Sequence, residues 1–168
     1  MPALSLVIRP ELPDDAGAIE RLHARTFGPG RYARTAFRLR EGAGHRLDLS
    51  VTASVGSFLV GSVRMAPVTA GDVRFLALGP LAVDPSFGGR GVGTALMRAS
   101  LAAATAAGEG LVILVGDAPF YARFGFTPVP PDHLALPGPV DPARFLRLEL
   151  KAGFFETARG DVAAIRPA

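Results

Sequence analysis

The chain has 168 residues, of which 49% are hydrophobic and 20% are charged, a composition typical of a globular protein and not of a disordered one. It contains no cysteine, so disulfides, thiolate metal sites and a cysteine nucleophile are excluded. The formal net charge of +3 comes almost wholly from scattered arginines that are not clustered with aromatic residues, so we expect no nucleic-acid partner.

Hydropathy, the first residues and the length predict the cellular location and the number of domains. No uncharged stretch is apolar enough and long enough to span a bilayer, so we expect no membrane partner. The first four residues, Met1 to Leu4, lack the basic-then-apolar order of a signal peptide, which favours the cytoplasm. The length predicts a single domain over residues 1–168.

One strand and two helices are predicted near the N-terminus. Leu4 to Arg9 has the alternation of an edge or first strand. Pro13 stands at the start of a helix that ends near Gly28 and places on one face Ile19, Leu22 and Thr26. Tyr32 to Glu41 has the spacing of a second, short helix.

An antiparallel meander of three strands is predicted next. Leu47 to Ala53 and Phe58 to Ala66 are joined by a tight turn, and a second turn leads into Val73 to Val83. The third strand contains Gly79-Pro80. Because proline cannot donate to a ladder and glycine marks irregular backbone, we expect a bulge or splay there.

Helices and strands alternate in the rest of the chain. A helix from about Gly91 to Ala107 carries on one face Val92, Ala95, Leu96, Ala99 and Ala103. Leu111 to Val115 is continuously apolar, as in a parallel strand that is buried on both faces. Asp117 can cap a short helix that reaches Phe124. Leu146 to Leu150 alternates as a half-buried strand does, and Gly160 to Ile165 predicts a short final strand.

The glycine loop, residues 88–94, favours the binding of a bulky anion. Its four glycines leave the backbone without Cβ atoms where a strand passes into a helix, so several N–H groups can point at one phosphate. A P-loop requires a lysine where Thr94 stands, and a dinucleotide-binding fingerprint requires a glycine at the same position. Both of these phosphate-binding motifs are therefore disfavoured.

The glycine loop instead resembles the acyl-CoA pyrophosphate loop of the GCN5-related N-acetyltransferase (GNAT) superfamily, Q/R-x-x-G-x-G/A, with Gly91-Val92-Gly93 as its second half. Leu78 to Pro85 resembles the fourth strand of that superfamily, and Gly116 to Phe126 resembles its second cofactor segment. The chain is most similar to the YhbS-type predicted acetyltransferases, whose second segment reads close to G-D-P-x-Y-Y-x-R-F-G-F. Gly88 in place of Gln or Arg, and Phe120 in place of the first tyrosine, are departures from the pattern.

The resemblance implies an α/β (α+β) fold of the GNAT type. This fold has a central mixed, mostly antiparallel sheet of six to seven strands, which is splayed at the cofactor site and flanked by about four helices. The resemblance also implies transfer of an acetyl group from acetyl-CoA (coenzyme A) to a primary amine by direct attack on the thioester. The acceptor is then a small-molecule or protein amine, and, as in many relatives, the chain can pair with a second copy as a homodimer.

The resemblance assigns roles to particular residues. Backbone N–H groups of the glycine loop hold the pyrophosphate, an N–H of the irregular strand holds the oxyanion, and Tyr121 is the general acid. The expected cofactor-binding residues are Leu81, Ala82, Val83, Gly89, Arg90, Gly91, Val92, Gly93, Thr94, Asp117, Phe120 and Arg123. The three histidines are far apart in the sequence, and we propose no metal.

The general base is the part that the sequence leaves open. Many relatives carry a glutamate on the fourth strand, and Val73 to Val83 contains none. Glu41, His45 and Asp48 lie in the segment expected to border the acceptor, and any of them, or a water relay, can serve. The missing glutamate keeps a second hypothesis open, a non-catalytic acyl-CoA-binding or sensing domain, and a general nucleotide-binding protein is the third.

Overall fold

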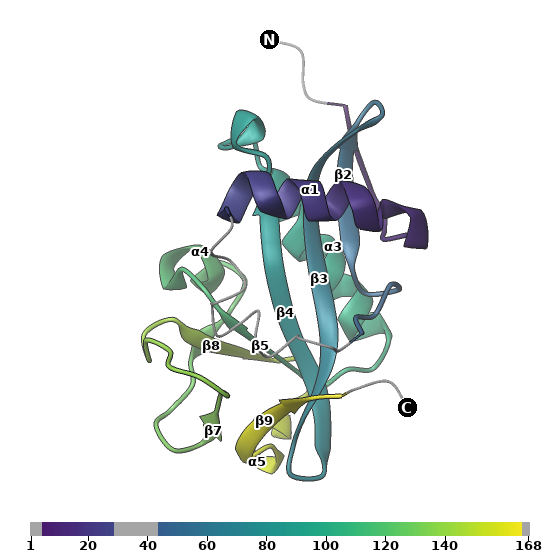
Figure 1. The fold of residues 1–168 in the computed structure, drawn as a ribbon. Coiled ribbons are helices and arrows are strands. Elements are labelled where there is room, and N and C mark those ends of the chain that lie inside the picture. The colour runs from purple at the N-terminus through teal and green to yellow at the C-terminus, as the bar shows by residue number, and fades with distance from the viewer. Residues whose placement is uncertain (1–4, 29–43, 166–168) are drawn as a thin grey trace.

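The structure is a computed structural model that describes residues 5–28 and 44–165. Its strands are β1 (Leu6–Pro10), β2 (Val51–Val55), β3 (Phe58–Ala70), β4 (Val73–Val83), β5 (Leu111–Val115), β6 (Thr127–Pro128), β7 (Leu134–Ala135), β8 (Phe145–Glu149) and β9 (Gly160–Ala164). They lie side by side in the order β1, β2, β3, β4, β5, β8, β6, while β9 pairs with β3 at its lower end and β7 pairs with β9 (Figure 1).

The sheet is mixed and mostly antiparallel, as the sequence predicts. Strands β1 to β4 pair antiparallel with their neighbours in chain order, which confirms the predicted meander, although its first strand begins at Val51 and not at Leu47, because residues 47–49 form a turn. Strand β5 pairs parallel with β4 and antiparallel with β8. The predicted last strand is also present, as β9, and it pairs antiparallel with β3 through residues 162–164.

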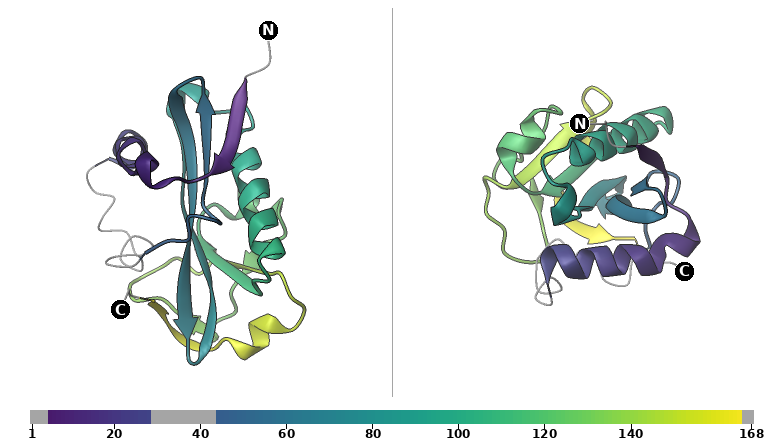
Figure 2. Two further views of the ribbon diagram at one scale, coloured as in Figure 1. Left: turned by 90° about the vertical axis from the view of Figure 1, so that its right-hand side faces the viewer. Right: turned by 90° about the horizontal axis from the view of Figure 1, so that it is seen from above.

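Helices cover both faces of the sheet. They are the 3-10 turns η1 (Pro13–Asp15) and η3 (Pro85–Phe87) and the α-helices α1 (Ala16–Phe27), α3 (Val92–Ala106), α4 (Ala118–Ala122) and α5 (Phe154–Thr157). Helix α1 lies on one face and α3 on the other (Figure 2). Ile19 and Leu22 of α1 are buried against Leu59 and Ala82, as their spacing predicts. The helix predicted for residues 32–41 lies outside the described residues.

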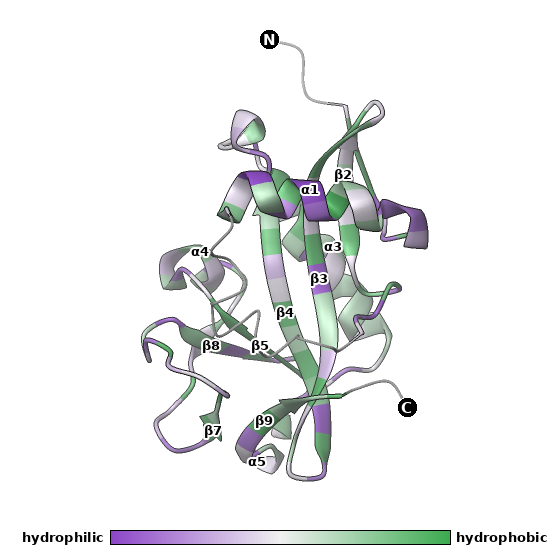
Figure 3. Cartoon of the chain, viewed as in Figure 1, coloured by the Kyte–Doolittle hydropathy of each residue, from purple (hydrophilic) through white to green (hydrophobic). Residues whose placement is uncertain are grey.

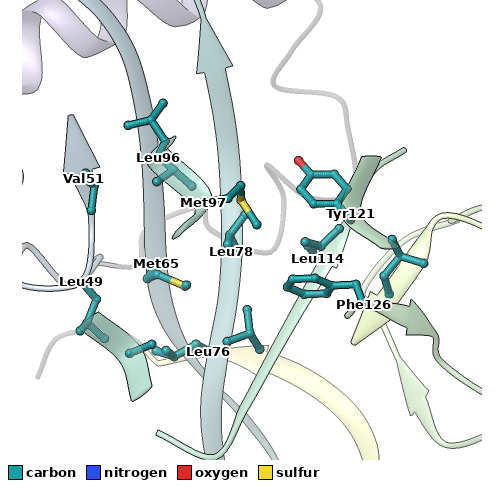
Figure 4. Close-up of a cluster of buried hydrophobic side chains, with 14 of the residues drawn as sticks. Leu49, Val51, Met65, Leu76, Leu78, Leu96, Met97, Leu114, Tyr121 and Phe126 are labelled. Carbon is teal, nitrogen blue, oxygen red and sulfur yellow. The ribbon is translucent and has the colours of Figure 1, made fainter. Parts of the chain in front are cut away.

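The main core lies between α3 and the central strands, where hydrophobic residues follow β3 and β4 (Figures 3 and 4). The buried face of α3 differs from the predicted one: it consists of Val92, Leu96, Met97, Ser100 and Ala104. The predicted members Ala95, Ala99 and Ala103 are only half-buried. This face carries the large side chains of Leu96 and Met97, and it can include the polar Ser100 because the Ser100 hydroxyl donates a hydrogen bond of 2.7 Å to the Leu49 carbonyl.

Three short elements of the C-terminal third were not predicted. They are β6, β7 and α5, which have two to four residues each. Phe155 of α5 is buried in a second hydrophobic cluster with residues of β3, β5 and β9. In the described ranges, none of the helices has the length and hydropathy that a bilayer crossing requires.

Replacing Gly61 with alanine should destabilise the fold, because side chains of α3 lie directly over this residue of β3. A Cβ at Gly61 would lie 2.8 Å from Leu96 Cδ1 and 3.0 Å from Val92 Cγ1, and both side chains are buried. We expect the free energy of unfolding, measured by denaturant titration, to fall by about 1–3 kcal/mol. Gly44→Ala is the control, because a Cβ there meets nothing within 4 Å. Equal stability of Gly61→Ala and the parent would contradict this packing.

Candidate functional site

Within the described residues, the part of β4 that follows Ala77 is hydrogen-bonded to a neighbouring strand, β3, on one side only. Strand β5 pairs with β4 through Leu76 and Ala77 and then diverges. Just beyond this point Gly79 and Pro80 of β4 lie opposite the single residue Arg64 of β3, which is a β-bulge. The expected bulge is confirmed, and beyond Ala77 the backbones of β4 and β5 diverge (Figure 1); we call the region between the diverging backbones the opening.

Backbone groups of β4 point into this opening. The Asp84 N–H donates a 2.7 Å hydrogen bond to the Val60 carbonyl of β3. Because successive N–H groups of a strand point to opposite sides, those of Leu81 and Val83 point away from β3 and into the opening. Ala82 turns its N–H toward β3 instead, so Leu81 and Val83 are the better candidates for a ligand contact.

The glycine loop begins after η3 and faces open space. Gly89 and Gly91 have φ angles of 72° and 79°, a left-handed conformation that favours glycine. A Cβ at either residue would meet nothing within 4 Å. Gly91 is the N-cap of α3, and the N–H groups of the first helical turn have no acceptor within the helix. The loop and helix start therefore have the free donors and the space that a phosphate needs.

Helix α4 meets the start of α3 beside the opening. A Cβ placed on Gly93 would lie 3.6 Å from Phe120 Cζ, 3.7 Å from Val83 Cγ2 and 4.0 Å from Leu81 Cδ2. The structure thus brings together three predicted segments: the end of β4, the glycine loop and the second cofactor segment. Phe120, which replaces a tyrosine of the family pattern, contributes its ring to this junction.

Two guanidinium groups flank the glycine loop. Arg123 Nη2 donates a 3.3 Å hydrogen bond to Thr94 Oγ1, and its guanidinium lies 5.5 Å from the centroid of the Phe120 ring. Arg90 lies over the Phe87 ring at 6.0 Å. Asp117 caps α4 as predicted, since its Oδ2 accepts a 3.3 Å hydrogen bond from the Phe120 N–H. The positive charges suit a phosphate ligand.

Tyr121 is buried at the edge of the main core. Its ring lies directly on Gly116 and contacts Phe126, and its hydroxyl oxygen is directed away from Leu114 and Phe126 (Figure 4). Burial, with a smaller contribution from the Asp117 carboxylate, raises the pKa of Tyr121 to about 12. The phenol therefore stays protonated at neutral pH and can act as a proton donor.

The candidate bases differ in their surroundings. Glu41 lies outside the described residues. The Asp48 side chain is 62% exposed, and its hydrogen bond with Arg46 lowers the pKa of its carboxyl, so it is a poor proton acceptor. His45 Nε2 lies 2.7 Å from Glu11 Oε2, and Arg64 donates to both oxygens of Glu11 at 3.0 and 3.1 Å. We call these three residues the Glu11–His45–Arg64 cluster.

Comparison with known proteins identifies the family. A family model described as an acetyltransferase (GNAT) domain matches residues 50–128, from the start of β2 to the end of β6. The uncharacterized N-acetyltransferase YhbS of Escherichia coli is 33% identical over 123 residues, which are 72% of this chain and 73% of that protein. The chain belongs to the GNAT acetyltransferase family.

Solved GNAT structures have the same fold. The crystal structure of E. coli YhbS in complex with CoA matches with a TM-score of 0.82 and 28% identity, and covers 98% of this chain and 92% of that one. A GNAT family acetyltransferase from Brucella melitensis in complex with acetyl-CoA matches with a TM-score of 0.62 and 28% identity, over 86% and 96% of the two chains. The GNAT fold expected from the sequence is confirmed.

Sequence reasoning missed two members of the Glu11–His45–Arg64 cluster. An arginine within the apolar strand β3 was a usable signal, because a charged residue there requires a partner. Glu11 gave no such signal, since it is 34 residues from His45 and 53 from Arg64. Over the part of the chain that the structure describes, no group of three His, Asp or Glu side chains is placed to hold a metal ion.

The phenol of Tyr121 should titrate near pH 12 instead of near pH 10. The chain has two tyrosines, so a Tyr32→Phe variant leaves Tyr121 as the only phenol, and its phenolate absorbance can be followed in an alkaline titration. Because the folded state keeps a proton that the unfolded chain has lost, the stability should fall as the pH rises from 10 toward 12.

Circular dichroism at each pH serves as the control for this titration, since it shows over which range the protein stays folded. A phenolate transition near pH 10 in folded protein would contradict the burial of the hydroxyl.

Proposed function

We propose that this GNAT chain forms a single domain that transfers the acetyl group of acetyl-CoA to a small-molecule or protein primary amine, by direct attack on the thioester. The observation that carries the proposal is the junction at Gly93, where the glycine loop, the free edge of β4 and the helix of Tyr121 meet. The CoA and acetyl-CoA complexes of the two solved relatives support the choice of cofactor.

The residues of the glycine loop fit a pyrophosphate. Backbone N–H groups from Gly89 to Thr94 would donate charge-assisted hydrogen bonds, and the absent Cβ atoms leave the space that the phosphates fill. Gly88 supplies no side chain, so the contact depends on the backbone at this end. Arg123 is placed to add a positive charge at the helix start.

The free edge of β4 fits the rest of the cofactor. Its donors and acceptors can pair with the amide groups of the pantetheine arm, much as an added strand pairs with a sheet edge. The N–H of Leu81 or Val83 would then hold the thioester oxygen as negative charge develops on it. One such donor typically contributes about 3 kcal/mol to transition-state stabilisation.

Tyr121 would serve as the general acid. Coenzyme A supplies the thioester and a sulfur leaving group whose thiol has an ordinary pKa of about 8.5. The phenol is a weaker acid than this thiol, because burial raises the pKa of Tyr121 to about 12. Transfer of this proton to the thiolate is therefore uphill by itself, so the phenol would donate a hydrogen bond to the sulfur as the C–S bond breaks, and a proton from the amine nitrogen would replace the one that the phenol gives up.

A second candidate function is a non-catalytic acyl-CoA-binding or sensing domain. The observation that favours it is the sequence of β4, which carries no carboxylate where many relatives have a glutamate. Such a domain would use the same glycine loop and the same free edge. It would differ from the enzyme in releasing no thiol when an amine is added.

Replacing Gly91 with valine should abolish acetyl-CoA binding, measured by isothermal titration calorimetry, because the side chain would fill the space above the loop. Gly153→Val is a matched control. Gly153 is also a helix N-cap, with φ 82° and ψ −6° against 79° and 8° for Gly91, and a Cβ there also meets nothing within 4 Å. Unchanged affinity in Gly91→Val would refute the assignment of the loop.

Tyr121→Phe should lower kcat by ten-fold or more while the affinity for acetyl-CoA stays close to that of the parent, because only the transition state uses the phenol proton. Initial rates of thiol release with a panel of primary amines, together with calorimetry of acetyl-CoA binding, separate the two effects. If the variant turns over as fast as the parent, Tyr121 is not the general acid.

A further inference from the structure

We infer that His45 is the general base that takes a proton from the acceptor amine, and that Glu11 is a positioning residue that orients the imidazole. This inference rests on the proposed function, because an amine acceptor supplies the proton. The structure adds a buried carboxylate behind the ring: the Glu11 side chain is 1% exposed, and its Oε2 lies 2.7 Å from His45 Nε2. The His45 side chain is 27% exposed, so its ring is accessible from solvent.

The cluster fixes which ring nitrogen can accept a proton. Burial by itself raises the pKa of the Glu11 carboxyl, but the hydrogen bonds from His45 and Arg64 outweigh burial, and the pKa lies below its ordinary value. Glu11 is therefore a carboxylate, which only accepts hydrogen bonds. His45 Nε2 must then carry the hydrogen that Glu11 accepts, and the lone pair of the neutral ring is on Nδ1.

The cluster lies at the level of the β4 bulge, on the face of the sheet opposite α3. Val63 and Met65 pack in the same core as Leu96 and Met97 of α3. Arg64 stands between Val63 and Met65 in β3, so its side chain points to the other face. It is also the residue that lies opposite the bulge.

In the proposed complex an amine can approach the thioester from the face of the sheet opposite α3. We call this the second face, and the face that α3 covers is the first. Helix α3 covers the first face (Figure 2), and α4 contacts the start of α3 through Phe120, so the residues proposed to hold the cofactor lie on that side. The second face is where α1 and the Glu11–His45–Arg64 cluster lie. A base on that side, acting directly or through one water, is on the side from which the nucleophile arrives.

The protons balance with His45 as base and Tyr121 as acid. An ammonium acceptor gives its first proton to His45 Nδ1, which frees the lone pair that forms the new C–N bond. The Glu11 carboxylate stabilises the imidazolium that results, as a carboxylate does in a catalytic triad. As the C–S bond breaks, the Tyr121 phenol protonates the sulfur, and the second proton from nitrogen restores the phenol. The products are the amide, the free thiol and one proton released from His45.

Among the described residues, several charged side chains lie near the His45 ring in space or in sequence. Glu11 faces it from the end of β1, and Arg64, on β3, holds Glu11. Arg46 and Asp48, the nearest charged residues in sequence, pair with each other at 2.7 Å. A purely structural role of the Glu11–His45–Arg64 cluster would be to hold the end of β1 against β3. The experiment must separate that role from catalysis.

His45→Gln is the variant that tests the inference, because a glutamine amide can still donate to Glu11 and keep the fold. The measurement is kcat/KM for the best amine of a panel of alkylamines, amino acids and short peptides, from pH 7 to pH 10. At pH 7 we expect a loss of about a hundred-fold. Toward about pH 10 an alkylamine becomes neutral without a base, so the loss should shrink toward zero. Tyr121 stays protonated over this range.

Glu11→Gln should show a smaller loss with the same pH dependence, because the imidazolium loses its counter-ion but the base remains. Since removal of a buried charge can also weaken the fold, melting curves accompany this variant. Glu109→Gln is the control. It removes another carboxylate that pairs with the same loop, through Arg46 at 2.9 Å, and should leave the rate unchanged.

The outcomes separate the inference from the proposed function. A loss in His45→Gln that is absent, or equal at every pH, overturns the assignment of the base while the enzyme stands. A parent protein that binds acetyl-CoA and releases no thiol with any amine overturns the proposed function and the base with it.

Discussion

The pairing of β4 is the constraint on which the rest of the site depends. Strand β5 follows β4 only as far as Ala77, and the bulge at Gly79-Pro80 comes directly after this point. Beyond the bulge, the N–H groups of Leu81 and Val83 point to a side where no described strand accepts them. Backbone donors that leave water require a partner, so in the proposed complex the amides and the carbonyl of the cofactor would pair with this edge. The glycine loop and Tyr121 lie beside the same edge, where they would contact the pyrophosphate end and the thioester end of that cofactor.

Packing of α3 fixes the loop against this edge. The helix can approach β3 closely because Gly61 has no side chain under Leu96 and Val92. The burial of Leu96 and Met97 and the hydrogen bond of the Ser100 hydroxyl to Leu49 together set which face of the helix is turned toward the sheet. The first turn of α3, and with it the loop, therefore has a position set by the core. A site whose donors are backbone groups gains its precision from packing of this kind.

Features with local causes could be predicted from the sequence. The glycine loop, the Asp117 cap and the irregular backbone at Gly79-Pro80 each follow from what one or two residue types can do. The buried face of α3 could not, because it includes the polar Ser100, whose hydroxyl finds its acceptor on Leu49, 51 residues away in the sequence. The same is true of the Glu11–His45–Arg64 cluster, whose members meet only after β1 and β3 have taken their places in the sheet. The two-residue strands β6 and β7 exist through their partners β8 and β9, and carry no pattern of their own.

The most direct test of the account is the release of free thiol from acetyl-CoA, followed with a thiol reagent, with and without a panel of primary amines. Mass spectrometry of the reaction mixture identifies any acetylated amine. The account predicts thiol release that depends on the amine, and a product heavier by one acetyl group. Binding of acetyl-CoA without thiol release, across the whole panel, would contradict it and favour a domain that senses acyl-CoA.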